Sequence, residues 1–151
     1  MRSSRQWADL GFRTLNAVHR MVLRASGGRI GRRAFGMEVV ELVTIGRRSG
    51  QRRLTMLTVP VIEGDSLVLV ASKGGDQRDP DWMKNLVANP RIEVTMSGQR
   101  RRMLARLASS DEHARLWPQV VARYGPYDHY RQRAHRIIPL VICTPDGVES
   151  P

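Results

Sequence analysis

The first periodic feature of the chain is an apolar stripe near its beginning. Between residues 5 and 24, apolar side chains recur at intervals of three and four, which predicts an amphipathic helix. The stripe consists of Trp7, Leu10, Gly11, Leu15, Val18 and Val22. Arginines occupy much of the other surface, so the helix either packs on its own domain, the commoner arrangement, or lies on an anionic membrane. The Gly- and Arg-rich residues 26–36 predict a flexible connector after it.

Runs of β-branched and other apolar residues follow and predict about six strands. They cover residues 37–45, 54–62, 66–71, 91–97, 101–107 and 137–143. The sequence Glu-Gly-Asp-Ser after the second run, and Gly98-Gln99 after the fourth, predict hairpin turns. Pro60 has no N–H to donate, so it predicts an edge strand or a bulge within the second run.

Two helices are predicted between these strands. Asp79 predicts an N-cap, and the proline after it predicts the first helical position. The helix is expected to cover residues 81–88. Ser109 and Glu112 form a capping box, which predicts a helix as far as Arg123, and a short tyrosine-bearing segment follows it. Tight turns without strict βαβ alternation favour a mainly β fold with some α (α+β), a small antiparallel barrel with helices packed outside.

The charge balance narrows the range of partners. The chain has 25 basic and 14 acidic residues, which gives a net charge of +11. Lys73 and Lys84 are its only lysines, so nearly all the positive charge is carried by guanidinium groups, whose fork geometry suits phosphates and carboxylates. Such a surface favours nucleic acid, anionic lipid or a polyanionic small ligand, and charge alone does not choose among them.

Several kinds of catalytic site are excluded by the residues that are missing. Cys143 is the only cysteine, so an internal disulfide, a cysteine-rich zinc site and a CxxC redox pair are all impossible. The four histidines are scattered, and no HExxH or GxSxG motif occurs, so neither a metal site nor a nucleophilic serine is predicted. Without a signal-peptide core or an apolar run near 18 residues, we expect a soluble, reduced, cytoplasmic protein.

Two loops have the composition of an anion-binding site. Residues 46–53 read Gly-Arg-Arg-Ser-Gly-Gln-Arg-Arg, and residues 71–75 read Ala-Ser-Lys-Gly-Gly. Glycines allow backbone N–H groups to approach a ligand, and guanidinium groups add charge. A strand follows the first loop and the Walker lysine is missing, so nucleoside triphosphate hydrolysis does not fit. On spacing alone, two ordinary basic turns remain an equally good interpretation.

Nucleic-acid binding would use the same arginines together with stacking aromatic residues. Tyr124, Tyr127 and Tyr130 are clustered in one segment, however, and are not interleaved with the basic strands. A stacking platform needs that interleaving, so a nucleic-acid partner is disfavoured.

The order of the short motifs along the chain points to one family. They are Gly46-Arg47-Arg48-Ser49-Gly50-Gln51-Arg52-Arg53, Ala71-Ser72-Lys73-Gly74-Gly75, Asp79-Pro80-Asp81-Trp82-Met83-Lys84-Asn85-Leu86, Ala88-Asn89-Pro90, Trp117-Pro118-Gln119, the three tyrosines, Ile138-Pro139-Leu140-Val141 and Cys143-Thr144-Pro145. Over residues 38–145 this ordered set closely resembles the deazaflavin (F420)-dependent nitroreductase family of split β-barrel flavin and deazaflavin oxidoreductases.

The resemblance implies a fold, a cofactor and a domain organisation. The fold is a split β-barrel like that of FMN-binding proteins, with short packed helices. The cofactor is coenzyme F420, an 8-hydroxy-5-deazaflavin hydride carrier whose phospholactyl oligoglutamate tail would give the arginines a small-molecule partner. Residues 1–36 would be a helix and linker, 37–145 the deazaflavin-binding domain and 146–151 a tail.

The resemblance also implies a cofactor groove built from four short stretches and one tyrosine. The first stretch would hold the phosphate and part of the acidic tail, the second would pass along the deazaflavin, the third would line its ring, and the fourth would close the groove. In that order they are Arg47, Arg48, Ser49 and Arg53; Leu54, Thr55, Met56 and Leu57; Ala71, Ser72, Lys73 and Gly74; and Asp81, Trp82, Met83, Lys84 and Asn85, with Tyr127 as the tyrosine.

For catalysis the resemblance implies hydride transfer to a quinone, an activated enone or a nitroaromatic acceptor. Tyr127 and Tyr130 would face that acceptor, with Ser72 as a hydrogen-bond donor. Arg52 and Met56 stand where the family commonly has proline, so the resemblance does not fix the shape of the groove. If the acceptor is a membrane quinone, the N-terminal helix would anchor the protein on the inner face of the cell membrane.

Two other functions stay open at this point. One is an FMN-binding split-barrel protein. The other is a non-catalytic module that binds anionic lipid or nucleic acid.

Overall fold

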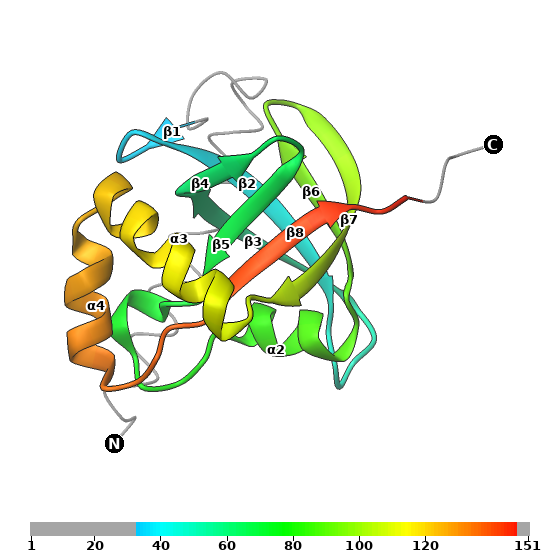
Figure 1. Ribbon diagram of the computed structural model, residues 1–151. Helices are drawn as coiled ribbons and strands as arrows, with labels where there is room; N and C mark the ends of the chain where they lie inside the picture. The colour runs from blue at the N-terminus through cyan, green and yellow to red at the C-terminus, as the bar shows by residue number, and fades with distance from the viewer. Residues whose placement is uncertain (1–32, 148–151) are drawn as a thin grey trace.

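The computed structural model describes residues 33–147. The predicted helix at residues 5–24 and the last four residues lie outside this range. Within it the chain forms eight strands, three α-helices and one short 3-10 helix, η1 (Figure 1). In chain order they are β1 (Arg33–Ala34), β2 (Met37–Ile45), β3 (Arg52–Val59), β4 (Val61–Glu63), β5 (Ser66–Val70), η1 (Lys73–Gly75), α2 (Asp81–Ala88), β6 (Arg91–Met96), β7 (Gln99–Leu107), α3 (Ser110–Arg123), α4 (Pro126–Ala134) and β8 (Leu140–Pro145).

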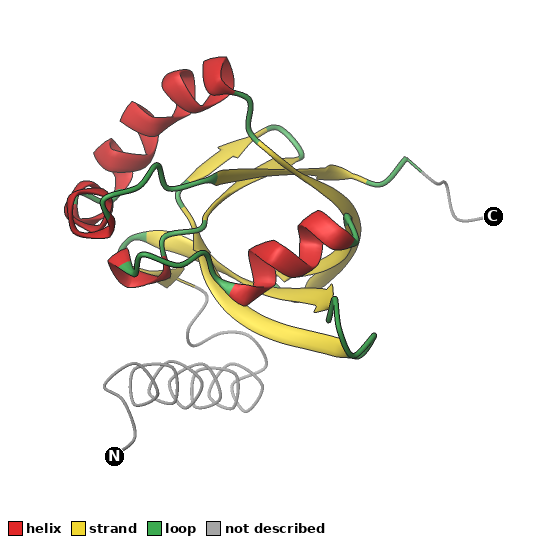
Figure 2. Ribbon diagram, turned by 90° about the horizontal axis from the view of Figure 1, so that it is seen from below, coloured by secondary structure: helices red, strands yellow, loops and turns green. Residues whose placement is uncertain are grey.

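The strands form one antiparallel sheet in the order β1-β2-β6-β7-β8-β5-β4. β3 lies off this path and pairs with β2, from Glu38 opposite Val59 to Ile45 opposite Arg52. β1 and β6 both pair with β2 as well, at different positions along it. The sheet curls into a half-barrel, α2 lies across one of its open ends, and α3 and α4 lie outside it (Figure 2). The fold is therefore α+β, as the sequence predicts.

Two hydrophobic cores lie on the two faces of the curled sheet. The inner core contains Leu67 and Leu69 of β5 together with the buried face of α2. The outer core contains Val68 and Val70 of the same strand, packed with side chains of α3 and α4. Successive strand residues point to opposite faces, so β5 is buried on both sides. Each fully buried Leu or Val contributes about 1.5–3 kcal/mol, which holds the strand before the η1 turn firmly in place.

The end of the predicted connector forms a hairpin. Arg33 and Ala34 pair with the start of β2, so the prediction of a flexible connector is wrong for these residues. The turn between the strands has positive φ at Phe35 (54°) and at Gly36 (76°). Two-residue hairpins favour this backbone, but a phenylalanine at positive φ is uncommon, which is why the sequence gives no hairpin signal here.

Two turns differ from prediction by small shifts. The second predicted strand is broken at Pro60, which separates β3 from β4. The β6–β7 hairpin turns at Ser97-Gly98 and not at Gly98-Gln99, with positive φ at both residues. Gln99 pairs opposite Met96 and already belongs to β7. The Glu-Gly-Asp-Ser turn is confirmed, because Glu63 and Ser66 pair as the closing residues of β4 and β5.

The helices show where capping signals are reliable. α2 covers the predicted residues, but its N-cap is Pro80 and the carboxylate of Asp79 instead accepts a hydrogen bond from Arg136 at 2.8 Å. The capping box of α3 is confirmed: the Ser109 hydroxyl accepts from the Glu112 N–H, and the Glu112 carboxylate accepts from the Ser109 N–H.

The segment after α3 departs most from the prediction. α4 forms there, although no helix is predicted. The prediction misses it because only Tyr127 and Ala134 of its residues are buried, so the helix has no apolar stripe. The last strand begins at Leu140 and not at Ile137, whose side chain is 78% exposed. Residues 135–139 are left as a linker from α4 to β8.

Candidate cofactor and acceptor site

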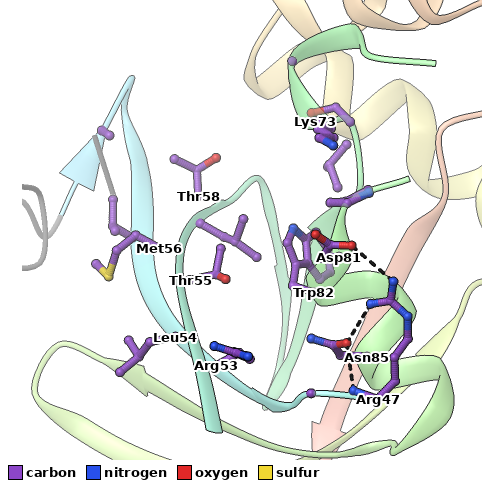
Figure 3. Close-up of a pocket in the computed structure, with 18 of the residues that line it drawn as sticks. Arg47, Arg53, Leu54, Thr55, Met56, Thr58, Lys73, Asp81, Trp82 and Asn85 are labelled. Carbon is purple, nitrogen blue, oxygen red and sulfur yellow. Dashed lines mark hydrogen bonds and ion pairs between the residues drawn. The ribbon is translucent and has the colours of Figure 1, made fainter. Parts of the chain in front are cut away.

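A cleft runs along β3. Its volume is about 1020 Å³, the upper end of the usual size of small-molecule sites. Its walls come from the β1–β2 turn, the β2–β3 turn, β3, the η1 turn, the start of α2 and one residue of α4 (Figure 3). The lining residues are Ala34, Phe35, Val39, Gly46, Arg47, Arg48, Ser49, Arg53, Leu54, Thr55, Met56, Leu57, Thr58, Val70, Ser72, Lys73, Gly74, Pro80, Asp81, Trp82, Asn85 and Tyr127.

The β2–β3 turn forms one end of the cleft and is closed by its own backbone. The Gly46 N–H donates to the Gln51 carbonyl at 2.7 Å, and the Gly50 N–H donates to the Gly46 carbonyl at 2.8 Å. A Cβ at Gly46 would lie 2.6 Å from the Ser49 hydroxyl oxygen, and Gly50 has a positive φ of 68°. The turn is therefore a compact glycine-dependent loop of the kind that binds anions.

Arg47 ties this turn to α2. Its guanidinium donates to Asn85 Oδ1 at 3.0 Å and to Asp81 Oδ1 at 3.3 Å, and its backbone N–H donates to the same Asn85 oxygen (Figure 3). Asn85 is buried and donates in turn to the Thr44 hydroxyl at 3.4 Å. Since its guanidinium is bonded to Asn85 and its charge is paired with Asp81, Arg47 positions the turn against the helix.

Arg48 and Arg53 are differently placed. Both are exposed at the cleft, and neither makes an ion pair with any residue in the range 33–147. The one side-chain hydrogen bond of Arg53 within that range goes to the Ser49 hydroxyl, at 3.4 Å. Two guanidinium groups beside a glycine turn are thus available for an anionic ligand.

Arg52 lies outside the cleft, although it stands in the Arg-rich motif. It forms a two-point ion pair with Glu93 of β6, at 2.7 and 3.2 Å, and Arg100 of β7 pairs with the same carboxylate. The hydrogen bond from Arg52 holds the pKa of Glu93 below its usual range. Arg52 therefore joins strands on the outside of the sheet, while its neighbour Arg53 faces the cleft.

The η1 turn forms the wall that faces β3. Lys73, Gly74 and Gly75 have successive positive φ values of 47°, 63° and 88°. Ser72 precedes them and is buried, and its hydroxyl has no hydrogen-bond partner among the described residues. Arg78 closes the loop by a two-point pair with Asp76, and this side-chain hydrogen bond holds the pKa of Asp76 well below its usual range.

Aromatic rings form the other end of the cleft. Phe35, at the tip of the β1–β2 turn, is 72% exposed and lies 5.1 Å from the ring of Tyr124. Tyr124 packs edge-on to Tyr127, and Tyr127 packs edge-on to Tyr130. Tyr127 is buried, and its hydroxyl lies 2.9 Å from that of Thr58 on β3. Burial raises the pKa of the Tyr127 phenol, which keeps it protonated at neutral pH.

Most of the residues predicted for the cofactor groove line this one cleft. The exceptions are Ala71 and Met83, which are buried in the inner core, and Lys84, which is exposed and is not a lining residue. Tyr130 packs beside Tyr127 but does not line the cleft. Sequence reasoning missed Phe35 and Thr58, because neither belongs to a charged or glycine-rich motif.

The lining fits an elongated anionic cofactor with a flat ring system. It combines a compact glycine turn, two arginines that have no carboxylate partner within residues 33–147, and a strand with apolar side chains. No group of residues within positions 33–147 has the geometry to hold a metal ion.

Comparison with known proteins decides the family. The profile of the family described as "F420H(2)-dependent quinone reductase" matches residues 15–145. The chain belongs to this quinone reductase family. It is 38% identical over 132 residues to the F420H(2)-dependent quinone reductase Rv1261c of Mycobacterium tuberculosis, covering 84% of this chain and 87% of that protein. The structure titled F420-H2 dependent reductase (FDR-A) aligns with a TM-score of 0.63 and 34% identity, covering 70% of this chain and 92% of that one.

Family membership gives the enzyme its activity. It is an F420H2-dependent quinone reductase, and its two ligands are the reduced deazaflavin coenzyme and a quinone-type acceptor. No helix within the described part of this reductase is long and apolar enough to cross a membrane.

Proposed function

We propose that this quinone reductase holds coenzyme F420 in the cleft along β3, with the acidic tail at the β2–β3 turn and the acceptor at the aromatic end. The observation that carries this proposal is the chemical division of the cleft. The basic turn follows β2 and the Phe35 turn precedes it. Nine strand residues separate the two ends by roughly 27 Å, which suits a ligand with a ring at one end and a charged tail at the other.

At the basic end, Arg48, Ser49 and Arg53 would hold the phosphate and the first carboxylates of the tail. Arg47 would contribute mainly by holding the turn against α2. The backbone N–H groups at the start of α2 add a favourable field for an anion beside Asp81. Supporting this assignment, Arg48 and Arg53 have no carboxylate partner in the part of the chain that the structure describes.

In the middle of the cleft, residues 54–57 of β3 and residues 72–74 of the η1 turn would contact the ring system from opposite sides. When bound, the reduced coenzyme supplies a hydride from C5 of its deazaflavin. The protein's part is to orient the two reactants and to keep water away from them, which can lower a barrier by several kcal/mol through positioning alone. The buried surroundings of Ser72 and Trp82 favour both tasks.

Ser72 beside the η1 turn and Tyr127 at the aromatic end are the polar groups that would steady the negative charge developing on the acceptor. The Ser72 hydroxyl, which has no hydrogen-bond partner within residues 33–147, would donate to a ligand. The Tyr127 phenol stays protonated and is oriented by Thr58. Tyr130 would act through its edge-on contact with Tyr127, and Phe35 would cover the apolar side of the acceptor.

A lipid quinone is the acceptor that best suits the exposed Phe35 ring at the aromatic end of the cleft. Activated enones or nitroaromatics would be further substrates of the same chemistry. The basic amphipathic pattern at residues 5–24 would then serve to bring the enzyme to an anionic membrane at the cytoplasmic face. Co-sedimentation with anionic vesicles, compared between the full chain and a chain lacking residues 1–30, tests this point. Equal binding by both would contradict it.

In fold terms, we assign the curled sheet to the FMN-binding type of split β-barrel. Residues 37–145 would form the deazaflavin-binding domain. Support comes from the single antiparallel sheet, whose bordering strand β3 opens on the cleft.

The decisive experiment mixes the purified full-length chain with reduced F420 and menadione and follows the return of deazaflavin absorbance. We expect turnover that saturates in both substrates, and micromolar binding of F420 in a direct titration. A parallel titration with FMN provides the comparison. Binding of FMN and not of F420 would overturn the proposed site, as would binding of neither.

A further inference from the structure

Outside the cleft, Arg136 makes five side-chain hydrogen bonds with described residues. It lies in the linker between α4 and β8, its side chain is only 16% exposed, and it does not line the cleft. Its Nε donates to the Asp76 carbonyl at 3.1 Å and its Nη1 donates to Asp79 Oδ1 at 2.8 Å. Its Nη2 lies within hydrogen-bond distance of three further carbonyl oxygens, those of Ala71, Ser72 and Arg78, at 3.1, 3.4 and 3.1 Å.

These acceptors all belong to one loop, residues 71–79, which leaves β5 and leads to α2. Four of the five acceptors are backbone carbonyls of the loop, and that of Ser72 also accepts from the Gly75 N–H at 2.9 Å. A planar guanidinium with its donors in a fixed fork can serve them together, which a lysine ammonium cannot. Arg136 therefore fixes the path of the loop backbone from within.

The loop needs such support because its middle is strained. Lys73 adopts a positive φ without being a glycine, and two glycines at positive φ follow it. A non-glycine residue in this region costs on the order of 1 kcal/mol or more and persists only where its surroundings impose it. Ser72, Lys73 and Gly74 are also the part of the loop that faces the cleft.

The same loop is packed tightly against α4. A Cβ at Gly75 would lie 3.2 Å from the Cα of Tyr130, closer than ordinary van der Waals contact, so the helix backbone packs tightly against the turn. Arg133 of α4 donates to the Gly74 carbonyl at 3.4 Å. Whatever fixes the loop consequently also fixes the distance between the η1 turn and the helix that carries the tyrosines.

We propose that Arg136 is a positioning residue for coenzyme binding: its guanidinium holds residues 72–74 in the shape that receives the deazaflavin, and through Gly75 it keeps α4 in register with them. This inference rests on the proposed function, because it takes the cleft as the coenzyme site. Arg136 would touch neither coenzyme nor acceptor and would act through the loop backbone.

The test compares three variants of the full-length enzyme: Arg136→Ala, Arg136→Lys and the control Arg131→Gln. Arg131 is an exposed arginine on α4 whose guanidinium pairs with Asp128, and it does not line the cleft. The readouts are the dissociation constant of F420 by titration, the melting temperature, and restoration of binding by added guanidinium ions with sodium chloride as the ionic control.

We expect Arg136→Ala to weaken F420 binding by about 10- to 100-fold, since small displacements of a binding wall have effects of this size. Guanidinium at low millimolar concentration should restore part of the affinity, and Arg136→Lys should be intermediate. Arg131→Gln should stay within twofold of the wild type. If Arg136→Ala does not fold, the comparison of Arg136→Lys with Arg131→Gln decides the matter.

A lower melting temperature with unchanged F420 affinity in Arg136→Ala or Arg136→Lys would overturn the positioning role and reduce Arg136 to a structural residue. Reduced affinity that guanidinium does not restore in Arg136→Ala would do the same. Failure of the wild-type enzyme to bind F420 would instead overturn the proposed site, so the two failures are distinguishable.

Discussion

The hydroxyl groups of Thr58 and Tyr127 lie 2.9 Å apart and join the strand that borders the cleft to the helix that carries the tyrosines. One of the two hydroxyls donates to the other. When Thr58 donates, the proton of the tyrosine points elsewhere and is available to the acceptor. The pair thus offers a direct test of the catalytic role of Tyr127.

We expect Tyr127→Phe to lower kcat for menadione by about 10- to 100-fold, because it removes one donor near the developing charge. Thr58→Val should have a smaller effect, by leaving the phenol without its orienting partner. The double variant should be no worse than Tyr127→Phe alone, since residues in one hydrogen-bond network are not additive. Additive losses, or an unchanged kcat in Tyr127→Phe, would argue against this role.

Arg52 and Arg53 provide a matched pair for the coenzyme tail. They are neighbours with identical chemistry, but Arg53 lines the cleft and Arg52 is paired with Glu93 outside it. A hydrogen bond to a charged group contributes about 1.5–3 kcal/mol, so Arg53→Gln should weaken F420 binding by roughly 10- to 100-fold. Arg52→Gln changes the net charge equally and should stay within about twofold. Equal effects of the two variants in the titration would mean that only overall charge matters.

Phe35 is expected to contribute to acceptor affinity and not to coenzyme binding. Its exposed ring would be covered by an apolar acceptor, so Phe35→Ala should raise KM for a long-tailed quinone by about tenfold, and by less for menadione. The control is Ile137→Ala, which removes an equally exposed apolar side chain that does not line the cleft. Steady-state kinetics with both quinones gives the answer; an unchanged KM for both would exclude Phe35 from the acceptor site.

The capping box of α3 makes the stability of the fold depend on pH in the acidic range. The hydrogen bonds from Arg106 and then from the Ser109 backbone lower the pKa of Glu112 from an ordinary 4.5 to about 2. A lowered pKa in the folded state stabilises the fold fully above the ordinary value, and this contribution is lost as the pH falls from about 4.5 towards 2. Glu112→Gln should therefore melt a few degrees below the wild type at pH 7, and the difference between the two melting temperatures should shrink as the pH falls below about 4.5 and vanish only below about pH 2. A constant difference across this range would show that ionisation of Glu112 is not the cause.

The parts of this fold that sequence patterns anticipate are those with local causes. The runs of β-branched residues place β2, and the Ser109–Glu112 spacing places the start of α3, because neighbouring residues alone decide both. α4 has only two buried residues and hence no stripe to detect. Asp79 has the sequence position of an N-cap, but in the structure its carboxylate instead accepts a hydrogen bond from the distant Arg136.

The candidate site follows the same division between local and distant causes. The Arg- and Gly-rich turn is recognisable from composition, but composition does not separate Arg53 from Arg52, which alternate between the two faces of one strand. Phe35 and Arg136 belong to no motif. Each gains its place from contacts with residues about 60 to 90 positions away, Arg136 with the loop at 71–79 and Phe35 with Tyr124.

The break at Pro60 has a consequence for how this enzyme can change. In the described chain β3 pairs with β2 alone, and after the proline β4 pairs with β5. The cleft therefore lies along the edge of β3 that has no strand partner among the described residues. The β3 side chains that line the cleft can be exchanged while the backbone pairing of β3 with β2 is kept. Relatives with other acceptors can therefore arise by substitutions along this line, while the two cores that hold the barrel together stay as they are.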